Sequence, residues 1–415
     1  MGITDDRIYV GLDLGTTKTC ALVGQIDEEG RPRIIGMGIC PSEGMRKGGV
    51  VSLEGVARTV KSAKDKAERT SGFEITSALV SISGGQVASQ NSKGMTAVSG
   101  RTIDLDDIGR AVEAARSLPV PHSREIVHVL PRGYVVDGQD GIKSPLGMHG
   151  FRLEVEAHIV TASTTALRNV EKSIESAGVA VDGWVLGSLA AAEVVLTDTE
   201  REMGVVVCDI GGGTTDLAIF IEGTVWHTAV IPVGGDHLTN DIAQGLHLPQ
   251  ETAEAVKGRH GHALQAALDP SQSFAVKPFG QDQPAQIRRV DLAAIIQPRV
   301  EELFGLVRQE IKRSGYDGLL PAGAVLTGGT SLMTGLREVA SNVLRLPVRL
   351  SQPDDLRGLA DQLHSPAFSA SIGLLRWAQS LEREAVPDGR TYGLSGWPRL
   401  SWGRAAEFFR RLLPG

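Results

Sequence analysis

The stretch MGVVVCDIGGGTTDLAIFIEG, Met203 to Gly223, carries the strongest indication of the fold. It consists of an apolar strand that ends at Asp209, a turn of glycines and threonines, and a second strand with alternating apolar residues. The stretch RIYVGLDLGTTKTCALVGQI repeats this plan 196 residues earlier, with Asp13 in the place of Asp209. Two related hairpins this far apart predict an internally duplicated α/β fold.

Both turns have the chemistry of an anion site. Glycine lets backbone N–H groups approach a phosphate closely, and threonine hydroxyls add further donors. The predicted phosphate ligands are Gly15, Thr16, Thr17 and Lys18 in the first turn and Gly211, Gly212, Gly213, Thr214 and Thr215 in the second. Asp13 and Asp209 would repel phosphate directly, but carboxylates beside phosphates suit Mg²⁺ that is held through water. The hairpins therefore predict a phosphate site with a magnesium ion.

A third glycine turn lies in AGAVLTGGTSLMTGLREVA, Ala322 to Ala340, between a predicted strand and an amphipathic helix. Gly328, Gly329 and Thr330 would let a base or an α-phosphate pack against the backbone. Any one of the three turns alone is typical of an ordinary hairpin or strand-to-helix turn. Together and in this order they predict a nucleotide site. The sequence has neither a P-loop pattern nor a GxGxxG after a strand.

The three turns resemble motifs of the actin, Hsp70 and sugar-kinase superfamily. DLGTTKT resembles the phosphate 1 motif, DIGGGTTD the phosphate 2 motif, and LTGGTSLMTG the adenosine motif. The resemblance implies an actin-like two-lobed ATPase fold of the α/β class, with duplicated β-sheet subdomains and with ATP and Mg²⁺ bound between the lobes.

A region inside the first half indicates the branch of this superfamily. It contains a predicted helix, DLDDIGRAVEAARSL, with Asp104 suited to be its N-cap, and two strand-like runs, EIVHVLPRGYVVDG and FRLEVEAHIVTAS. Its segments NSKGMTAVSG, VLPRGYVVDG and GIKSPLGMHG resemble the 1C subdomain of the FtsA family of actin-like bacterial cell-division proteins.

The resemblance implies the following division of the chain. Subdomain 1A covers residues 1–85 and 164–198, the 1C insert 86–163, subdomain 2A 199–236 and 311–380, subdomain 2B 237–310, a flexible linker 381–396, and a C-terminal amphipathic helix 397–413.

The second lobe resembles the same family in HTAVIPVGGDHLTNDIAQGL and AEAVKGRHGHAL. This resemblance implies that Gly235, Glu254 and Lys257 line the ATP site, the last two at the ribose and base. The alternative is an exposed helix ion pair, since Glu254 and Lys257 are i, i+3 neighbours. The resemblance also implies that subdomain 2B receives the C-terminal tail of FtsZ, and Arg288, Arg289 and Arg299 are candidate contacts.

No residue stands out as catalytic. Family members that hydrolyse ATP readily place Glu or Gln just before the helix LAAAEVVL, where this chain has Gly187 and Ser188. A serine is a poorer base and orienting group than a carboxylate or an amide. We therefore expect slow ATP hydrolysis at most.

The end of the chain, WPRLSWGRAAEFFRRLL, predicts an amphipathic helix. Its lipid-facing residues would be Trp397, Trp402, Phe408, Phe409, Leu412 and Leu413, and its basic residues Arg404, Arg410 and Arg411. Such a helix binds at the headgroup boundary of an anionic membrane. The alternative is a terminal helix that docks on the protein's own core. The Pro- and Gly-containing stretch before the helix and its basic character favour the membrane.

Composition limits the remaining choices. The net charge of −7 offers no general attraction for nucleic acid. The three cysteines suit a reducing cytoplasm, and we expect neither a secretory signal nor a membrane-spanning stretch.

The family resemblance implies an ATP-binding protein that forms homopolymers on the cytoplasmic face of the bacterial inner (plasma) membrane at the division site. It would anchor the FtsZ ring there as a peripheral membrane protein and recruit later divisome proteins. Two alternatives share the fold: an assembly platform like the type IV pilus protein PilM, and a sugar-kinase-type phosphotransferase. Neither needs the terminal helix.

Overall fold

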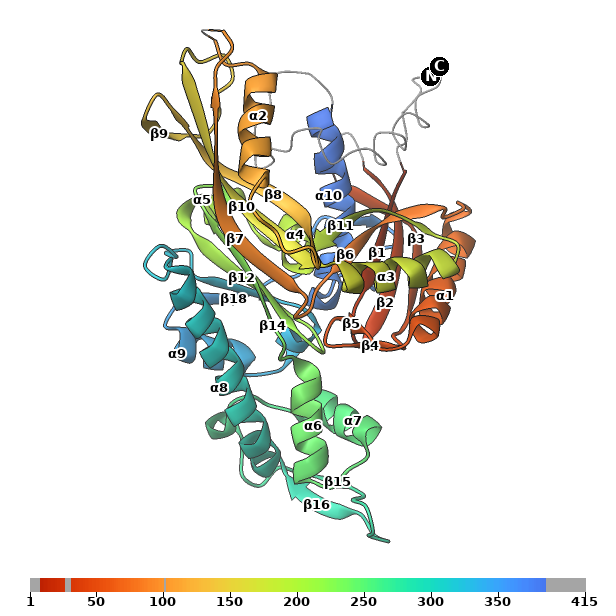
Figure 1. Cartoon of the computed structure of the whole chain (residues 1–415). Helices are drawn as coiled ribbons and strands as arrows, with labels where there is room; N and C mark the ends of the chain where they lie inside the picture. The colour runs from red at the N-terminus through yellow and green to blue at the C-terminus, as the bar shows by residue number, and fades with distance from the viewer. Residues whose placement is uncertain (1–7, 27–30, 101, 386–415) are drawn as a thin grey trace.

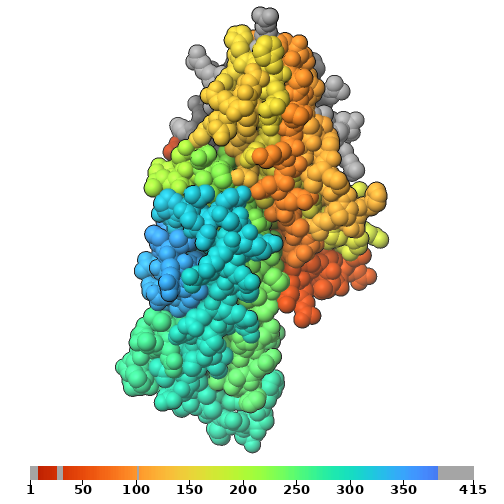
Figure 2. Space-filling view, turned by 60° about the vertical axis from the view of Figure 1, so that its left-hand side comes forward, coloured from red at the N-terminus to blue at the C-terminus, as the bar shows by residue number. Residues whose placement is uncertain are grey.

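The chain forms two lobes, an insert at one end and a helical region at the other (Figure 1). The computed structural model describes residues 8–26, 31–100 and 102–385. In the space-filling view the molecule is elongated, with the insert at the top and residues of the helical region at the bottom (Figure 2).

The first lobe is built on a sheet with strand order β11-β6-β1-β2-β3-β19. Its strands are β1 (Ile8–Leu14), β2 (Lys18–Ile26), β3 (Pro32–Pro41), β6 (Ser77–Ile82), β11 (Ala180–Leu186) and β19 (Arg357–Gly358). The second lobe has the order β14-β13-β12-β17-β18. Its strands are β12 (Val205–Ile210), β13 (Thr215–Ile221), β14 (Thr224–Ile231), β17 (Ala324–Thr327) and β18 (Val348–Leu350).

Apart from β19 at the edge of the first sheet, the two sheets share one topology. In each, a three-stranded antiparallel meander begins with a predicted hairpin, and two parallel strands continue the sheet from the first strand of that hairpin. Asp13 pairs with Cys20 in the first hairpin, and Asp209 pairs with Asp216 at the matching place in the second. The predicted duplicated α/β fold is confirmed.

Helices cover the sheets and join the lobes. They are α1 (Leu53–Ser71), α3 (Thr164–Ser176), α4 (Gly187–Val195), α5 (Asp198–Met203), α6 (Gly235–Gly245), α7 (Gln250–His260), α8 (Arg289–Ser314), α9 (Leu336–Leu344) and α10 (Ser369–Ala385). One core lies under α1 and α3, and another under α8 and α9. Helices α4 and α10 cross closely between the lobes, since a Cβ on Gly373 would lie 1.8 Å from the Ala190 carbonyl oxygen.

The insert is a four-stranded sheet with one helix. Its order is β7-β10-β8-β9, and its elements are β7 (Val87–Ala97), α2 (Leu105–Arg116), β8 (Arg124–Val136), β9 (Gln139–Ile142) and β10 (Arg152–Ser163). Asp104 is the N-cap of α2, as predicted, and its Oδ1 accepts a hydrogen bond of 2.8 Å from the Asp107 backbone N–H. Asp107 returns a bond to the Asp104 N–H, which completes a capping box.

The helical region at the opposite end contains α6, α7, part of α8 and a short hairpin of β15 (Ser273–Val276) and β16 (Ala285–Arg288). Helix α10 continues to Ala385 and so includes the first residues of the predicted linker. Good helix formers in SLEREA explain this extension. None of the described helices is both long and apolar enough to cross a bilayer. The predicted amphipathic helix at 397–413 lies outside the described residues.

Candidate functional site

The two predicted phosphate turns meet between the lobes. Each is closed by one backbone bond, from Gly15 N–H to Lys18 O at 3.0 Å and from Gly211 N–H to Thr214 O at 2.9 Å. A Cβ on Gly212 would lie 2.2 Å from Thr17 Oγ1, which belongs to the other lobe. The structure therefore brings the two turns into contact, and a side chain at Gly212 would have to displace the Thr17 hydroxyl.

The third turn joins the second hairpin. Gly328 has a φ of +85°, and a Cβ there would lie 2.4 Å from Asp209 Oδ1. The hydroxyl of Thr330, in the short turn η2 (Gly329–Leu332), donates a bond of 2.8 Å to the Gly211 carbonyl. Gly329 is less constrained, because its nearest neighbour would be Ala367 Cβ at 3.6 Å. The absence of a side chain at Gly328 thus lets the backbone pack against Asp209, whereas a side chain at Gly329 would be accommodated.

The start of α6 forms another wall. The Gly235 N–H donates to the Gly211 carbonyl at 3.0 Å, and a Cβ on Gly235 would lie 2.4 Å from Thr330 Oγ1. Lys257 Nζ donates to Gly235 O at 3.1 Å and to Glu254 Oε2 at 2.6 Å. The Lys257 side chain is only 12% exposed, so the helix ion pair exists and also borders the glycine turns.

Three carboxylates lie close to these turns. Asp13 accepts hydrogen bonds of 2.6 Å from the hydroxyls of Ser81 and Ser371. Burial raises the pKa of Asp209 to about 8, and the Asp216 and Asp13 carboxylates add to the shift. The site therefore gathers carboxyl groups beside the phosphate turns, and burial together with their mutual repulsion disfavours the charged form of Asp209.

The two oxygens of Asp216 differ in their hydrogen bonding. Its Oδ2 accepts bonds from Ser83 Oγ at 2.6 Å and from Thr214 Oγ1 at 3.0 Å, whereas its buried Oδ1 has no hydrogen-bond partner. Burial raises its pKa to about 7. A hydrated cation would satisfy the orphaned oxygen and relieve the repulsion among the carboxylates.

The residues therefore fit Mg²⁺ held through water. Within 8–26, 31–100 and 102–385, no three His, Cys, Asp or Glu side chains form a group that could bind an ion directly.

Asp216 was not among the sequence-predicted site residues, although a signal for it exists. It is the second aspartate of DIGGGTTD and the cross-strand partner of Asp209. Directly opposed residues in an antiparallel ladder project from the same face of the sheet. An aspartate facing the first one could therefore have been recognised from the hairpin register.

Lys18 points to a neighbour that sequence reasoning did not indicate. Its Nζ donates to the carbonyl of Ala367 and lies 4.7 Å from the centre of the Phe368 ring. Both residues belong to the short turn η3 (Pro366–Phe368) that precedes α10. The first phosphate turn is thereby joined to the start of the helix that crosses between the lobes.

The other predicted residues are bonded to partners outside the glycine turns. Ser188 is fully buried and donates to the Leu217 carbonyl at 3.3 Å. The three candidate arginines are engaged within the chain: Arg288 with Asp291, Arg289 with Gln272, and Arg299 with Asp241. The predicted membrane-binding residues lie outside the described part of the chain.

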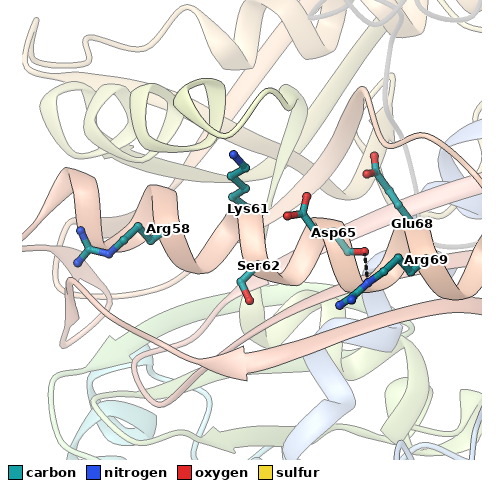
Figure 3. A pocket seen from close by; sticks show the side chains of 6 residues that line it. All are labelled: Arg58, Lys61, Ser62, Asp65, Glu68 and Arg69. Carbon is teal, nitrogen blue, oxygen red and sulfur yellow. Dashed lines mark hydrogen bonds between the residues drawn. The ribbon is translucent and has the colours of Figure 1, made fainter.

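A hollow lies along α1, and none of its lining residues belongs to the glycine turns (Figure 3). It is lined by Arg58, Lys61, Ser62, Asp65, Glu68 and Arg69. Arg58 is paired with Glu43, and both side chains are largely exposed. Mixed charges on one exposed helix face are typical of a solvated surface.

Solved structures with this arrangement define the class of fold. A chain of the PilM–PilN type IV pilus biogenesis complex is similar with a TM-score of 0.64 and 18% identity, over 89% of this chain and 98% of its own. MreB5 of Spiroplasma citri bound to ADP has a TM-score of 0.56 and 16% identity, over 92% and 100%. The MamK double helical filament has a TM-score of 0.52 and 14% identity, over 90% and 99%. This chain is an α/β protein of the actin-like ATPase fold.

Sequence comparison identifies the family. The model of cell division protein FtsA matches residues 206–373, and that of the SHS2 domain inserted in FtsA matches 84–161. Cell division protein FtsA of Pseudomonas aeruginosa is 42% identical over 394 residues, covering 95% of this chain and 94% of the relative. The Escherichia coli K12 protein is 38% identical over 404 residues, covering 95% and 96%. The chain belongs to the FtsA family of cell-division proteins, which confirms the resemblance.

Proposed function

We propose that this chain binds ATP between its lobes, polymerises on the cytoplasmic face of the inner membrane and anchors the FtsZ ring there. The meeting of the glycine turns of both lobes beside Asp209 and Asp216 carries the nucleotide part of the proposal. Backbone N–H groups would bind the phosphates, and Glu254 and Lys257 would contact the ribose and base; the bond from Lys257 to the Gly235 carbonyl supports this assignment. An actin-like relative bound to ADP supports the choice of ligand.

Bound Mg²⁺ would neutralise phosphate charge, with Asp13, Asp209 and Asp216 holding its water ligands. The protein's own groups orient these carboxylates: Ser81 and Ser371 fix Asp13, and Ser83 and Thr214 fix Asp216. Ser188 is buried and has a backbone partner, so it supplies neither a base nor a water-orienting group. This supports slow hydrolysis, with ATP acting mainly as an assembly ligand.

Asp216→Asn should weaken Mg²⁺-ATP binding about tenfold and raise the unfolding temperature by about 2 °C at pH 8. The folded-state pKa of Asp216, about 7, lies above its ordinary value of 3.8, so between these pH values the folded protein binds more protons than the unfolded chain. Stability therefore falls as pH rises through that window. The substitution removes this loss, and its stabilising effect should shrink at pH 5. Calorimetric titration measures the ATP affinity, and thermal unfolding measures the stability. If the difference in unfolding temperature between the variant and the wild type is the same at pH 5 and pH 8, the assignment is contradicted.

The membrane part rests on the sequence of residues 397–413. One amphipathic helix gives reversible binding, and a polymer would present many such helices at once. An actin-like relative that forms a double helical filament supports polymerisation. The FtsZ tail would bind the helical region that contains Arg288, Arg289 and Arg299, and the bound polymer would recruit later divisome proteins.

The test is flotation of the full chain with anionic liposomes, with and without Mg²⁺-ATP, and with the FtsZ tail peptide added. We expect ATP to increase the floated fraction and the peptide to float with it. A pilus-type platform would bind ATP without floating, and a sugar kinase would phosphorylate a small acceptor. Failure to float under all conditions would refute the membrane part.

A further inference from the structure

The insert belongs to the first lobe by sequence, yet it also docks on the second lobe. We propose that this docking is a second clasp across the nucleotide cleft, so that binding of ATP and docking of the insert strengthen each other. The inference rests on the proposed nucleotide site, and four sets of contacts support it.

The roots of the insert are held together in the first lobe. The Ser163 N–H donates to the Gln86 carbonyl at 3.1 Å, where the chain returns from the insert. Arg124 donates to the same carbonyl at 3.0 Å and to the Thr161 carbonyl at 2.8 Å. The insert therefore leaves the first lobe as one rigid stem.

The far side of the insert is bonded to β14 of the second lobe. His158 Nε2 and Thr228 Oγ1 lie 2.9 Å apart in a buried hydrogen bond, and Ser89 Oγ donates to the Thr228 carbonyl at 2.7 Å. Both His158 and Thr228 are almost completely buried. Separating the two surfaces would leave these polar groups without partners unless water entered.

An arginine extends the same docking surface. The Arg132 guanidinium, on β8 of the insert, lies 4.0 Å from the centre of the Trp226 ring on β14. Trp226 packs edge-on against Tyr316 of the second lobe, whose hydroxyl accepts a bond of 3.3 Å from Asn91 of the insert. Polar, cation–π and aromatic contacts thus act together across one boundary.

The boundary between the insert and β14 is connected to the phosphate turns at both of its ends, through Val233 after β14 and through Ser83 before the insert. Beyond β14, the Val233 carbonyl accepts a bond of 2.8 Å from Thr215 of the second phosphate turn. At the entrance to the insert, Ser83 donates to Asp216 and lies 2.9 Å from Thr214 Oγ1. Any rotation that separates the phosphate turns must therefore also strain the contacts of the insert.

The test measures the distance between the insert and each lobe in the full chain by electron–electron double resonance between pairs of spin labels. One labelled pair, Leu105→Cys in α2 and Leu319→Cys in the second lobe, reports docking of the insert. A reference pair, Leu105→Cys and Phe73→Cys, reports the distance from the insert to the first lobe. All three targets are exposed, whereas the native Cys20, Cys40 and Cys208 are buried. Mg²⁺-ATP should narrow the Leu105–Leu319 distribution.

The variant Arg132→Ala/Thr228→Val removes the cation–π contact with Trp226 and the hydrogen bond to His158, and so weakens the clasp. The distribution of distances between the labels at Leu105→Cys and Leu319→Cys should stay broad in this variant when Mg²⁺-ATP is added. Its ATP affinity should fall about five- to tenfold, because coupling between two sites is reciprocal. Lys93→Ala is the control, since Lys93 lies on β7 but pairs with Glu156 inside the insert. If the double variant does not fold, Ser89→Ala/Asn91→Ala uses less buried side chains. It removes the two hydrogen bonds to Thr228 and Tyr316 across the boundary, and also the bond between Asn91 and His158 within the insert.

Unchanged ATP affinity together with an unchanged distance distribution in the folded variant would overturn the proposal. Failure of the wild-type chain to bind ATP would instead refute the proposed nucleotide site. In that case the distance distributions of the wild type and the double variant without nucleotide still show whether the insert docks through Arg132 and Thr228. Failure of the nucleotide site and failure of the clasp are therefore distinguishable.

Discussion

Gly213→Val is expected to lower ATP affinity about 100-fold while leaving each lobe folded. The φ angle of Gly213 lies outside the left-handed region, so a side chain there causes no strain in the backbone dihedrals. A Cβ there would lie 2.6 Å from Thr16 Oγ1 and 2.9 Å from Lys47 Cα, both in the first lobe. Overpacking of this kind costs about 1–3 kcal/mol. The valine would relieve it by holding the lobes apart, which separates the phosphate turns.

Calorimetric titration with Mg²⁺-ATP measures the loss, and thermal unfolding checks the fold. Gly85→Val is the matched control, because a Cβ on Gly85 has no neighbour within 4 Å and its φ also lies outside the left-handed region. It should bind ATP as the wild type does. Wild-type affinity in Gly213→Val would mean that the two turns do not close on the same ligand.

The three turns could be predicted because their signals are local. An aspartate at the end of an apolar strand, followed by Gly and Thr, limits the backbone to few conformations wherever the chain leads afterwards. The helix beginning at Asp104 was predictable for the same reason, since its cap lies within four residues of the groups it satisfies. Such patterns also sufficed to predict the duplication of the sheets.

The different roles of Gly328 and Gly329 could not be predicted. The two residues are adjacent and identical, and only the approach of Asp209 from another strand shows which one excludes a side chain. The pairing of Arg299 with Asp241 spans 58 residues and joins two helices. Contacts between distant segments depend on packing, which residue spacing does not encode.

The docking of the insert on β14 is another long-range property. Sequence places the insert in the first lobe, but Thr228 and Trp226, which contact His158 and Arg132, lie in the second. Such contacts form only after both sheets have assembled. The family resemblance predicted that an insert exists without indicating which surface it covers.

Phe409→Glu is expected to lower binding to anionic liposomes about 100-fold or more. Phe408, Phe409, Leu412 and Leu413 fall on the apolar side of the helix expected from the sequence. Burying one such side chain contributes about 1.5–3 kcal/mol, and each 1.4 kcal/mol is about tenfold in affinity. The new carboxylate is also repelled by anionic headgroups. Flotation of the full chain measures the loss.

Arg410→Glu/Arg411→Glu separates the electrostatic contribution from the apolar one. Each arginine near an anionic surface contributes about 1 kcal/mol, so this variant should lose affinity for anionic vesicles and keep residual affinity for neutral ones. Phe409→Glu should lose both. ATP affinity should be unchanged in both variants, because the helix lies beyond a Pro- and Gly-containing stretch. If Phe409→Glu still floats, or unfolds at a markedly lower temperature, the helix packs on the protein's own core, and the membrane anchor must be sought elsewhere.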